Sequence, residues 1–168
     1  MDYKVLTKRF SFPPDFSAPI NFEYEDLRAK PLTRSDLHAD IDAVNSSLEI
    51  IRKTRGGSWP DEAVSEEFDF LDLAWHEREF RDGDSFAYVV YDDKNNYVGC
   101  FYLYPMGYRT ELSEENKSYE MDASWWVTQA AYEHGYYEKL YKAMKEWITV
   151  FPVSSIYYSN TDIPPEDR

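Results

Sequence analysis

The sequence has few of the residues and segments that would place it in a specialised class of protein. It contains one cysteine, Cys100, so neither a disulfide framework nor a cysteine-rich zinc site can form, and the apolar residues around Cys100 predict a buried thiol. No apolar run reaches the roughly 18 residues of a membrane-spanning helix. Met1 to Lys4 do not form an apolar signal core. We therefore expect a cytoplasmic protein that makes no contact with membranes.

Positive charge is also scarce. The chain carries 18 Lys and Arg residues against 32 Asp and Glu residues, a formal net charge of -14. Such a surface repels phosphate backbones and anionic headgroups, which argues against nucleic-acid binding. The acidic field would attract cationic amines, but we favour the simpler explanation that it keeps the protein soluble.

Aromatic residues are abundant, with 15 Tyr, 10 Phe and 5 Trp in 168 residues. This length fits one domain over residues 1–168 that can bury a single core. Most of the rings are expected in that core, and a minority could line a groove.

The first half of the chain predicts a lead-in, a strand and two helices. Residues 1–24 read as an irregular lead-in and 25–32 as a strand. A helix-start signal at 33–36 precedes apolar residues at spacings of three and four, which predicts one helix ending near 55–57. These apolar residues are Leu37, Ile41, Val44, Leu48 and Ile51.

A second helix is predicted to open at Trp59-Pro60-Asp61, where the proline and the acid suit a first turn. Its apolar stripe is expected to consist of Val64, Phe68, Leu71 and Trp75. The many carboxylates on its other faces are interpreted as a solvated surface, and His76 as an ordinary surface histidine.

The second half predicts a hairpin of strands 86–91 and 97–104, a strand 118–128, a helix 132–149, a strand 154–158 and a polar tail 161–168. A strand-helix-strand passage calls for a right-handed crossover between parallel strands. The predicted fold class is therefore α/β, with a mixed, mostly antiparallel sheet flanked by helices.

This element order resembles that of the GCN5-related N-acetyltransferases over residues 25–160. The opening 27–36, the hairpin 88–100 and the strand end Ser124-Trp125-Trp126-Val127-Thr128 are similar to segments of that family. The helix and strands that close the family's fold have no counterpart in this sequence, so the resemblance leads us to expect a truncated C-terminal part.

The resemblance implies acetyl-CoA as cofactor. Its pantetheine arm would pair with the strand end at Trp126, Val127 and Thr128, and Asn160 resembles an asparagine that follows the next strand in many members. Its diphosphate would lie on the following loop, where the family has Q/R-x-x-G-x-G/A and this chain has Tyr132, Glu133, His134, Gly135, Tyr136 and Tyr137. Of the three defining positions of the motif, only Gly135 matches. Glu133 adds a negative charge close to where the diphosphate would lie.

Family members transfer the acetyl group directly to an amine, which requires a base for the amine and an acid for the thiolate. Glu120 and Asp122 are the candidate bases, because two-residue spacing puts both on one strand face; either could instead be solvated. Tyr158 is the candidate acid.

Two functions are compatible with these residues. The first is an acetyl-CoA-dependent N-acetyltransferase acting on a small amine or a peptide amino group. The second is a non-catalytic binding or assembly module that has lost acetyl-CoA binding and whose aromatic groove walls could form a homodimer interface. No metal site is expected. A hydrolase is disfavoured because the chain has three histidines, one cysteine and no nucleophile-elbow motif.

Overall fold

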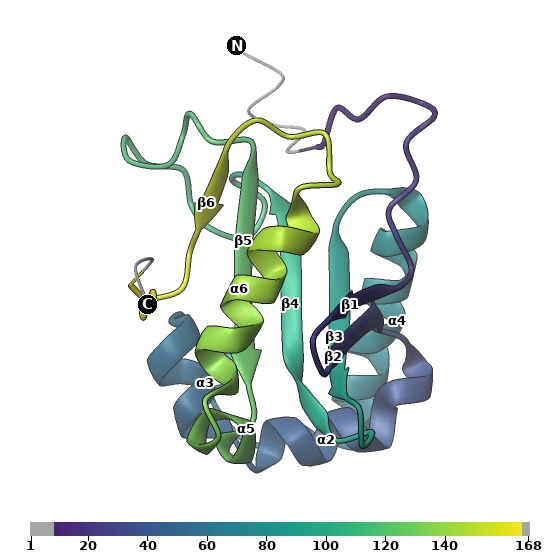
Figure 1. The fold of residues 1–168 in the computed structure, drawn as a ribbon, viewed down its shortest axis with the longest axis vertical. Coiled ribbons are helices and arrows are strands. Elements are labelled where there is room, and N and C mark those ends of the chain that lie inside the picture. Colours follow the sequence, from purple (N-terminus) through teal and green to yellow (C-terminus); the bar gives the residue numbers. More distant parts are fainter. Residues whose placement is uncertain (1–8, 166–168) are drawn as a thin grey trace.

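A six-stranded sheet runs through the molecule in the order β1-β2-β3-β4-β5-β6 (Figure 1). The computed structural model describes residues 9–165, so the start of the lead-in and the last three residues of the tail lie outside the described chain. Neighbouring strands are antiparallel except β5 and β6, which are parallel. The strands are β1 (Phe22–Tyr24), β2 (Leu27–Pro31), β3 (Phe86–Asp92), β4 (Tyr97–Pro105), β5 (Met121–Val127) and β6 (Ile156–Tyr158).

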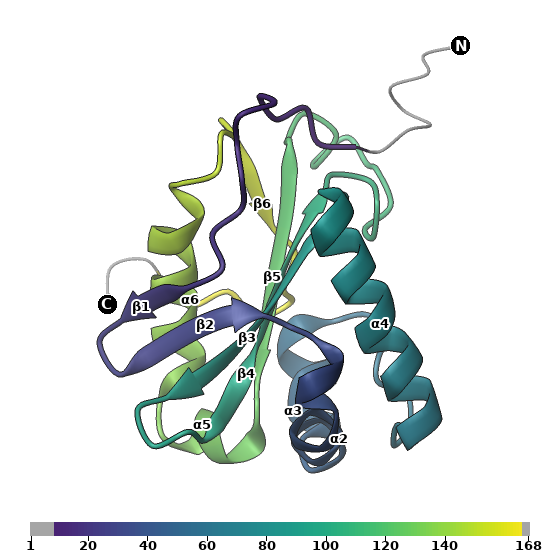
Figure 2. The same cartoon turned by 90° about the vertical axis from the view of Figure 1, so that its right-hand side faces the viewer.

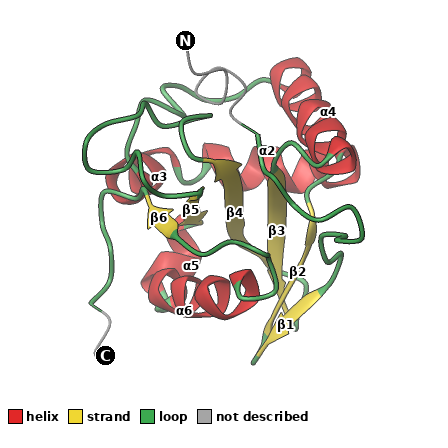
Figure 3. Cartoon of the chain, turned by 90° about the horizontal axis from the view of Figure 1, so that it is seen from above, coloured by secondary structure: helices red, strands yellow, loops and turns green. Residues whose placement is uncertain are grey.

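Helices cover both faces of this sheet. In Figures 2 and 3, α5 and α6 lie on one face, and α2, α3 and α4 lie on the other. The helices are the 3-10 turn η1 (Arg34–Asp36), α2 (Leu37–Asn45), α3 (Leu48–Arg55), α4 (Glu66–Asp82), α5 (Gln129–Glu133) and α6 (Tyr136–Ile148). The predicted α/β class with a mixed, mostly antiparallel sheet is therefore confirmed. No helix within residues 9–165 is both long and apolar enough to cross a bilayer.

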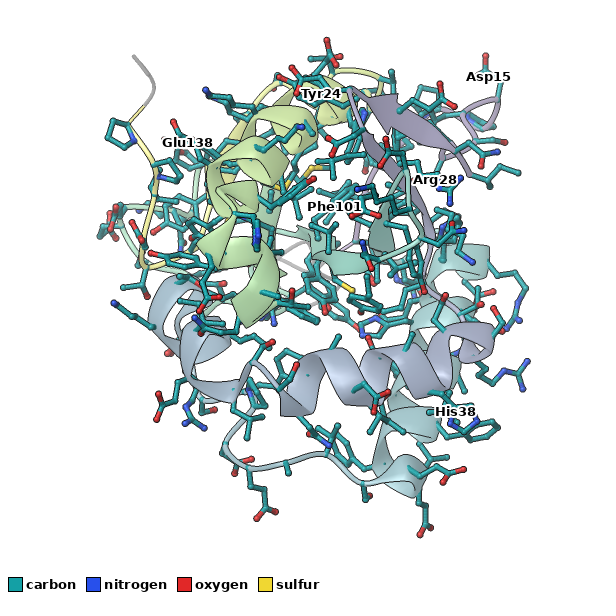
Figure 4. The ribbon with its side chains drawn as sticks, turned by 60° about the horizontal axis from the view of Figure 1, so that its bottom comes forward. Asp15, Tyr24, Arg28, His38, Phe101 and Glu138 are labelled. Carbon is teal, nitrogen blue, oxygen red and sulfur yellow. The ribbon has the colours of Figure 1, made fainter. Side chains whose placement is uncertain are left out.

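Each sheet face has its own core. Phe101 and Trp125 belong to the cluster under α6, whereas Cys100 and Trp126 belong to the cluster under α2, α3 and α4. Figure 4 shows Phe101 between the two helical layers and His38 on the outer side of α2. Trp125 and Trp126 are fully buried, so both tryptophans are core residues rather than walls of an open groove.

The lead-in and the first predicted helix differ from expectation. The last residues of the lead-in form β1, which pairs with β2. The predicted helix is interrupted at Ser46 and Ser47, giving α2 and α3. Serine competes with helical hydrogen bonding, and here the Ser47 hydroxyl accepts a hydrogen bond from the Gln129 amide at 2.9 Å. The interruption therefore ties this helical segment to the start of α5.

The second predicted helix begins later than expected. Ser65 is the N-cap of α4, and its hydroxyl accepts a hydrogen bond from the Phe68 amide at 3.1 Å. The segment predicted as the first turn is a loop, because the Arg52 guanidinium donates to the Pro60 carbonyl at 2.7 Å and Trp59 packs against Trp126.

The predicted apolar stripe of this helix is wrong. Phe68, Leu71 and Trp75 are each more than half exposed. The buried face of α4 carries Asp69, Leu73, His76 and Glu79. These polar residues are buried because tertiary contacts accommodate them. Glu79 accepts hydrogen bonds from Ser85 and Tyr108, and the His76 ring lies 5.6 Å from the Tyr102 ring.

Two buried carboxyl groups meet between α2 and α4. Asp40 and Asp69 are 4% and 1% exposed, and Asp69 donates a hydrogen bond to Asp40. Burial and then the neighbouring Asp40 raise the pKa of Asp69 to about 8, so Asp69 is protonated at neutral pH. The Tyr97 hydroxyl donates to the other carboxyl group, Asp40.

We predict that Leu73→Ala destabilises the protein by about 2–5 kcal/mol, since it removes a fully buried side chain. Leu71→Ala, two positions earlier on the exposed side of α4, should change the free energy of unfolding by about 0.5 kcal/mol or less. Urea unfolding of both variants checks this, and equal losses would contradict the observed orientation of α4.

We also predict that stability falls as the pH rises between the ordinary carboxyl pKa of 3.8 and about 8. The folded state retains the Asp69 proton across that window while the unfolded state releases it. Asp69→Asn cannot release this proton and still donates to Asp40. Its advantage over the wild type in urea unfolding should grow from pH 5 to pH 7 and level off above pH 8; a constant difference would refute the shared proton.

Candidate functional site

Strand β5 carries side chains to both helical layers. Its even-numbered residues Asp122, Ser124 and Trp126 point to the face covered by α3, where Arg55 donates to the Ser124 hydroxyl at 3.2 Å. Its odd-numbered residues Ala123, Trp125 and Val127 belong to the core under α6. This alternation agrees with the face that the sequence predicts for Asp122, Ser124 and Trp126.

The outer edge of β5 is paired with β6 for only three residues, from Met121 with Ile156 to Ala123 with Tyr158. One further backbone bond follows, from the Ser159 amide to the Ala123 carbonyl at 3.0 Å. The two strands then separate. In the family that the sequence resembles, this separation admits the pantetheine arm.

The Asn160 side chain occupies the β5 edge beyond that point. It accepts from the Trp125 amide at 3.1 Å and donates to the Trp125 carbonyl at 2.9 Å, so it substitutes for a strand. Asn160 is 6% exposed, and its amide nitrogen also lies 2.8 Å from the Tyr137 hydroxyl, to which it donates.

The residues after Asn160 connect the two helical layers. The Thr161 and Asp162 amides donate to the Arg55 and Thr54 carbonyls at 3.3 and 3.0 Å. The Tyr137 hydroxyl donates to the Asp162 carbonyl. The first part of the polar tail therefore covers the place where β5 and β6 separate.

The predicted diphosphate loop is mostly helical. The Thr128 hydroxyl accepts from the Ala131 amide at 3.1 Å and starts α5, which ends at Glu133. Gly135 is the N-cap of α6 with a φ of 81°, a backbone conformation that favours glycine. No heavy atom lies within 4 Å of the place where its Cβ would be, so the entrance to α6 is open. The predicted helix over 132–149 is thus two helices.

The surroundings of this loop are rich in carboxylates. Glu133 is exposed and Glu138 lies in the first turn of α6. The nearby Lys139 ammonium is paired with Asp26 and Glu25. Its hydrogen bond is the main cause that holds the pKa of Asp26 below its usual value.

The aromatic residues of the loop are also engaged. The Tyr136 hydroxyl donates to Asp26, and this bond raises the pKa of Tyr136 to about 12. Tyr137 is buried, and Tyr132 is half-buried against it, with ring centroids 5.8 Å apart. The exposed His134 donates from Nδ1 to the Ala130 carbonyl at 2.8 Å.

A cleft of about 1100 Å³ lies between this loop, α2 and the β3–β4 turn. Five carboxylates and two basic side chains line it: Asp26, Asp42, Asp92, Asp93 and Glu133, with Lys94 and His134. We call it the acidic cleft. It lies at the end of β5, about 20 Å along the strand from Asp122 at a rise of about 3.3 Å per residue.

The residues present fit acetyl-CoA only in part. The first-turn amides of α6 have no partner within the helix, and together with open Gly135 they suit a diphosphate. The strand edge does not fit a pantetheine arm while Asn160 holds Trp125. Trp126 and Val127 are buried and their backbones pair with β4.

The three predicted acid-base residues do not converge. Asp122 is fully buried; its Oδ2 accepts from the Thr110 hydroxyl at 2.5 Å and its Oδ1 has no hydrogen-bond partner. Glu120 precedes β5, is exposed and accepts from Ser154. Tyr158 lies on the α6 face, with its ring against Tyr141, so the sheet separates it from Asp122.

Sequence reasoning overlooked two arginines beside Asp122. Arg55 ends α3, and Arg109 lies in the loop between β4 and β5. The sequence pattern marked Arg55 only as the last residue of a predicted helix. It did not mark Arg109 at all, because the surroundings of this loop residue are made by distant parts of the chain. Within the described residues, no group of three or more His, Cys, Asp or Glu side chains could hold a metal ion.

Solved acetyltransferase structures share this architecture. RimL, a ribosomal L7/L12 alpha-N-protein acetyltransferase in complex with coenzyme A, matches with a TM-score of 0.55 at 14% identity over 78% of this chain and 66% of that one. A ribosomal-protein-S5-alanine acetyltransferase from Vibrio fischeri matches with a TM-score of 0.58 at 10% identity, over 79% of this chain and 68% of that one. A spermidine N-acetyltransferase that is a chimera from Vibrio cholerae and hSSAT matches with a TM-score of 0.50 at 17% identity, over 80% of this chain and 70% of that one.

These likenesses establish the fold, and the chain spans about two thirds of the length of the structures it matches. No family model matches the sequence. No curated protein matches it either.

Proposed function

We propose that this chain, which has the fold of the GCN5-related N-acetyltransferases, transfers an acetyl group from acetyl-CoA to the amino group of a small molecule or peptide. The separation of β6 from β5 after Ala123 and Tyr158 supports this proposal most directly. It ends the pairing of the two strands between Asp122 at one end of β5 and the open start of α6 at the other, along an edge that Asn160 and residues 161–162 now hold.

The start of α6 is the proposed place for the cofactor diphosphate. Gly135 leaves space, and the Tyr136 and Tyr137 amides provide donors at the positive end of the helix dipole. The nearby Glu133 works against this binding by about 1 kcal/mol at a distance of 4 Å in water. When bound, acetyl-CoA supplies the activated acetyl thioester.

We assign the role of base to Asp122 rather than Glu120. A base must have an oxygen that is free to bond the amine, and Asp122 Oδ1 has no hydrogen-bond partner among the described residues. The second oxygen is held by Thr110 at 2.5 Å, which fixes the carboxylate. Glu120 is already bonded to Ser154 and exposed to water. Tyr158 as the thiolate acid stays a prediction.

A non-catalytic binding module is the second candidate. It is favoured by one observation, the closure of the β5 edge by Asn160 and residues 161–162. The two candidates differ in a measurable way. An acetyltransferase must allow the cofactor to displace Asn160, whereas a binding module has no need to open.

We predict that Asn160→Ala binds acetyl-CoA about tenfold more tightly than the wild type, because the cofactor no longer competes for two hydrogen bonds of about 0.5–1.5 kcal/mol each. Titration calorimetry with acetyl-CoA and with CoA measures this. Asn45→Ala is the matched control: Asn45 makes the same pair of bonds to the Val64 backbone, at 2.8 and 3.1 Å, away from the β5 edge.

The outcomes separate the two candidates. Tighter binding by Asn160→Ala with wild-type affinity for Asn45→Ala supports a cofactor site at the β5 edge. An absence of heat for the wild type and for Asn160→Ala at millimolar acetyl-CoA would refute the enzyme and leave the binding module.

We further predict that Asp122→Asn lowers kcat by about 10²–10⁴, the usual contribution of a general base. Glu120→Gln should keep kcat within about twofold. Acetylation of an amine panel at saturating acetyl-CoA, with product detected by mass spectrometry, checks this pair. Equal activity of Asp122→Asn and the wild type would remove Asp122 from the mechanism.

A further inference from the structure

Two arginine side chains lie next to Asp122 without an ion-pair partner. Among residues 9–165, no carboxylate lies within ion-pairing distance of either Arg55 or Arg109. The protein as a whole carries 32 acidic residues, so two unpaired cations at one place are unexpected. We call Arg55 and Arg109 the arginine pair.

Arg55 is the more deeply buried of the two, with 5% of its surface exposed. Its Nε donates to the Ser124 hydroxyl at 3.2 Å, and its guanidinium carbon lies 4.3 Å from the centre of the Tyr102 ring. The ring face offsets part of the cost of burying the charge. The terminal nitrogens of the guanidinium group donate no hydrogen bond to residues 9–165, which leaves donors free on one side.

Arg109 completes the pair from the loop after β4. It is half-buried, and its Nη2 lies 3.5 Å from the place where a Cβ on the exposed Gly57 would be. Burial first and then the positive charge of Arg55 lower the pKa of Arg109 to about 10. An anion placed between the two guanidinium groups would favour their charged forms and so offset both effects on the pKa of Arg109.

Unpaired acceptors lie on the same side of the sheet. Asp122 Oδ1 is buried without a partner, and so is the Ser159 hydroxyl. Ser159 follows Tyr157 and Tyr158 in β6; because Tyr157 pairs with Asp122, Ser159 shares the Asp122 face by alternation. Buried polar atoms are almost always bonded, so this group of four side chains is incomplete without a ligand or water.

The charges specify what would complete the group. Two guanidinium groups require an anion, and a planar carboxylate matches their paired donors. The free oxygen of Asp122 requires a donor, which an ammonium group provides. A molecule that carries both groups satisfies the arginine pair and Asp122 at once, whereas a plain amine bonds only Asp122 and gives the arginine pair no anion.

We propose that Arg55, Arg109 and Asp122 form the acceptor site and select a small molecule that bears a carboxylate as well as the amine, as an amino acid does. The carboxylate binds the arginine pair, and the amine lies on Asp122 Oδ1. This inference rests on the proposed function for the acetylation of the amine, but the acceptor can bind without the cofactor. Gly57 is exposed and Arg109 is half-buried, so the arginine pair reaches the protein surface on this side.

The test is a binding measurement without acetyl-CoA. Glycine, β-alanine and 4-aminobutanoate are titrated calorimetrically against methylamine, ethylamine and propylamine, which match them in chain length and lack the carboxylate. We expect at least one of the three acids to bind at least tenfold more tightly than its matched amine. Equal affinity for acids and amines, or no binding of any acid at 10 mM, would overturn the proposal.

Variants locate the bound carboxylate. Arg109→Gln should weaken binding of the preferred acid at least tenfold, and Arg109→Lys should weaken it less. Arg81→Gln is the control, because Arg81 is largely exposed on α4 and lies outside the site. Wild-type affinity in Arg109→Gln would contradict the assignment.

A competition experiment covers the case in which Arg109→Gln fails to fold. Inorganic phosphate should displace the acid from the wild-type protein, because it competes for the same donors; a lack of displacement at 50 mM phosphate would count against an anion site. Since none of these measurements includes cofactor, failure of acetyl-CoA binding leaves them intact. A protein that binds the acid and not acetyl-CoA would retain the acceptor site and lose the proposed acetylation.

Discussion

The two hydrogen bonds between the Asn160 side chain and the Trp125 backbone determine how the rest of the site is arranged. A strand edge inside a protein must have its amide and carbonyl groups bonded, because each unsatisfied buried group costs about 1–3 kcal/mol. β6 meets this need for only three residues. Asn160 then meets it with one side chain. The chain after Asn160 is thereby directed across α6 and α3.

This closure places two different environments at the ends of one strand. The start of β5 has Asp122 and Ser124 beside the arginine pair, and the end of β5 leads into the acidic cleft. Between them Trp125 and Trp126 are packed into opposite cores with both indole nitrogens bonded, at 3.1 Å to the Tyr137 carbonyl and at 2.9 Å to the Tyr102 hydroxyl. Rigid packing on both sides fixes the orientation of each end, which is what a site built on a strand requires.

The sequence predicted those parts of the fold whose signal is local. Alternation and the turn residues located the β3–β4 hairpin, and helical spacing located α2, α3 and α6. The orientation of α4 was not predictable in this way, since Asp69, His76 and Glu79 are buried by partners on other elements while Phe68 and Leu71 are exposed. For the same reason Asp122 could be chosen as a candidate and Arg109 could not. A loop arginine gains meaning only when folding brings it beside β5.

Charge distribution links the two proposals. In a protein of net charge -14, the carboxylates near α6 oppose a diphosphate, so any affinity for a cofactor there must come from backbone amides and from the strand edge now held by Asn160. At the other end of β5 the balance is reversed, because two cations face a single buried carboxylate. A ligand with an acid group gains attraction there. The acidic surface near α6 disfavours an acidic acceptor, and the arginine pair favours it at the end of β5 where we propose that its amine lies next to Asp122.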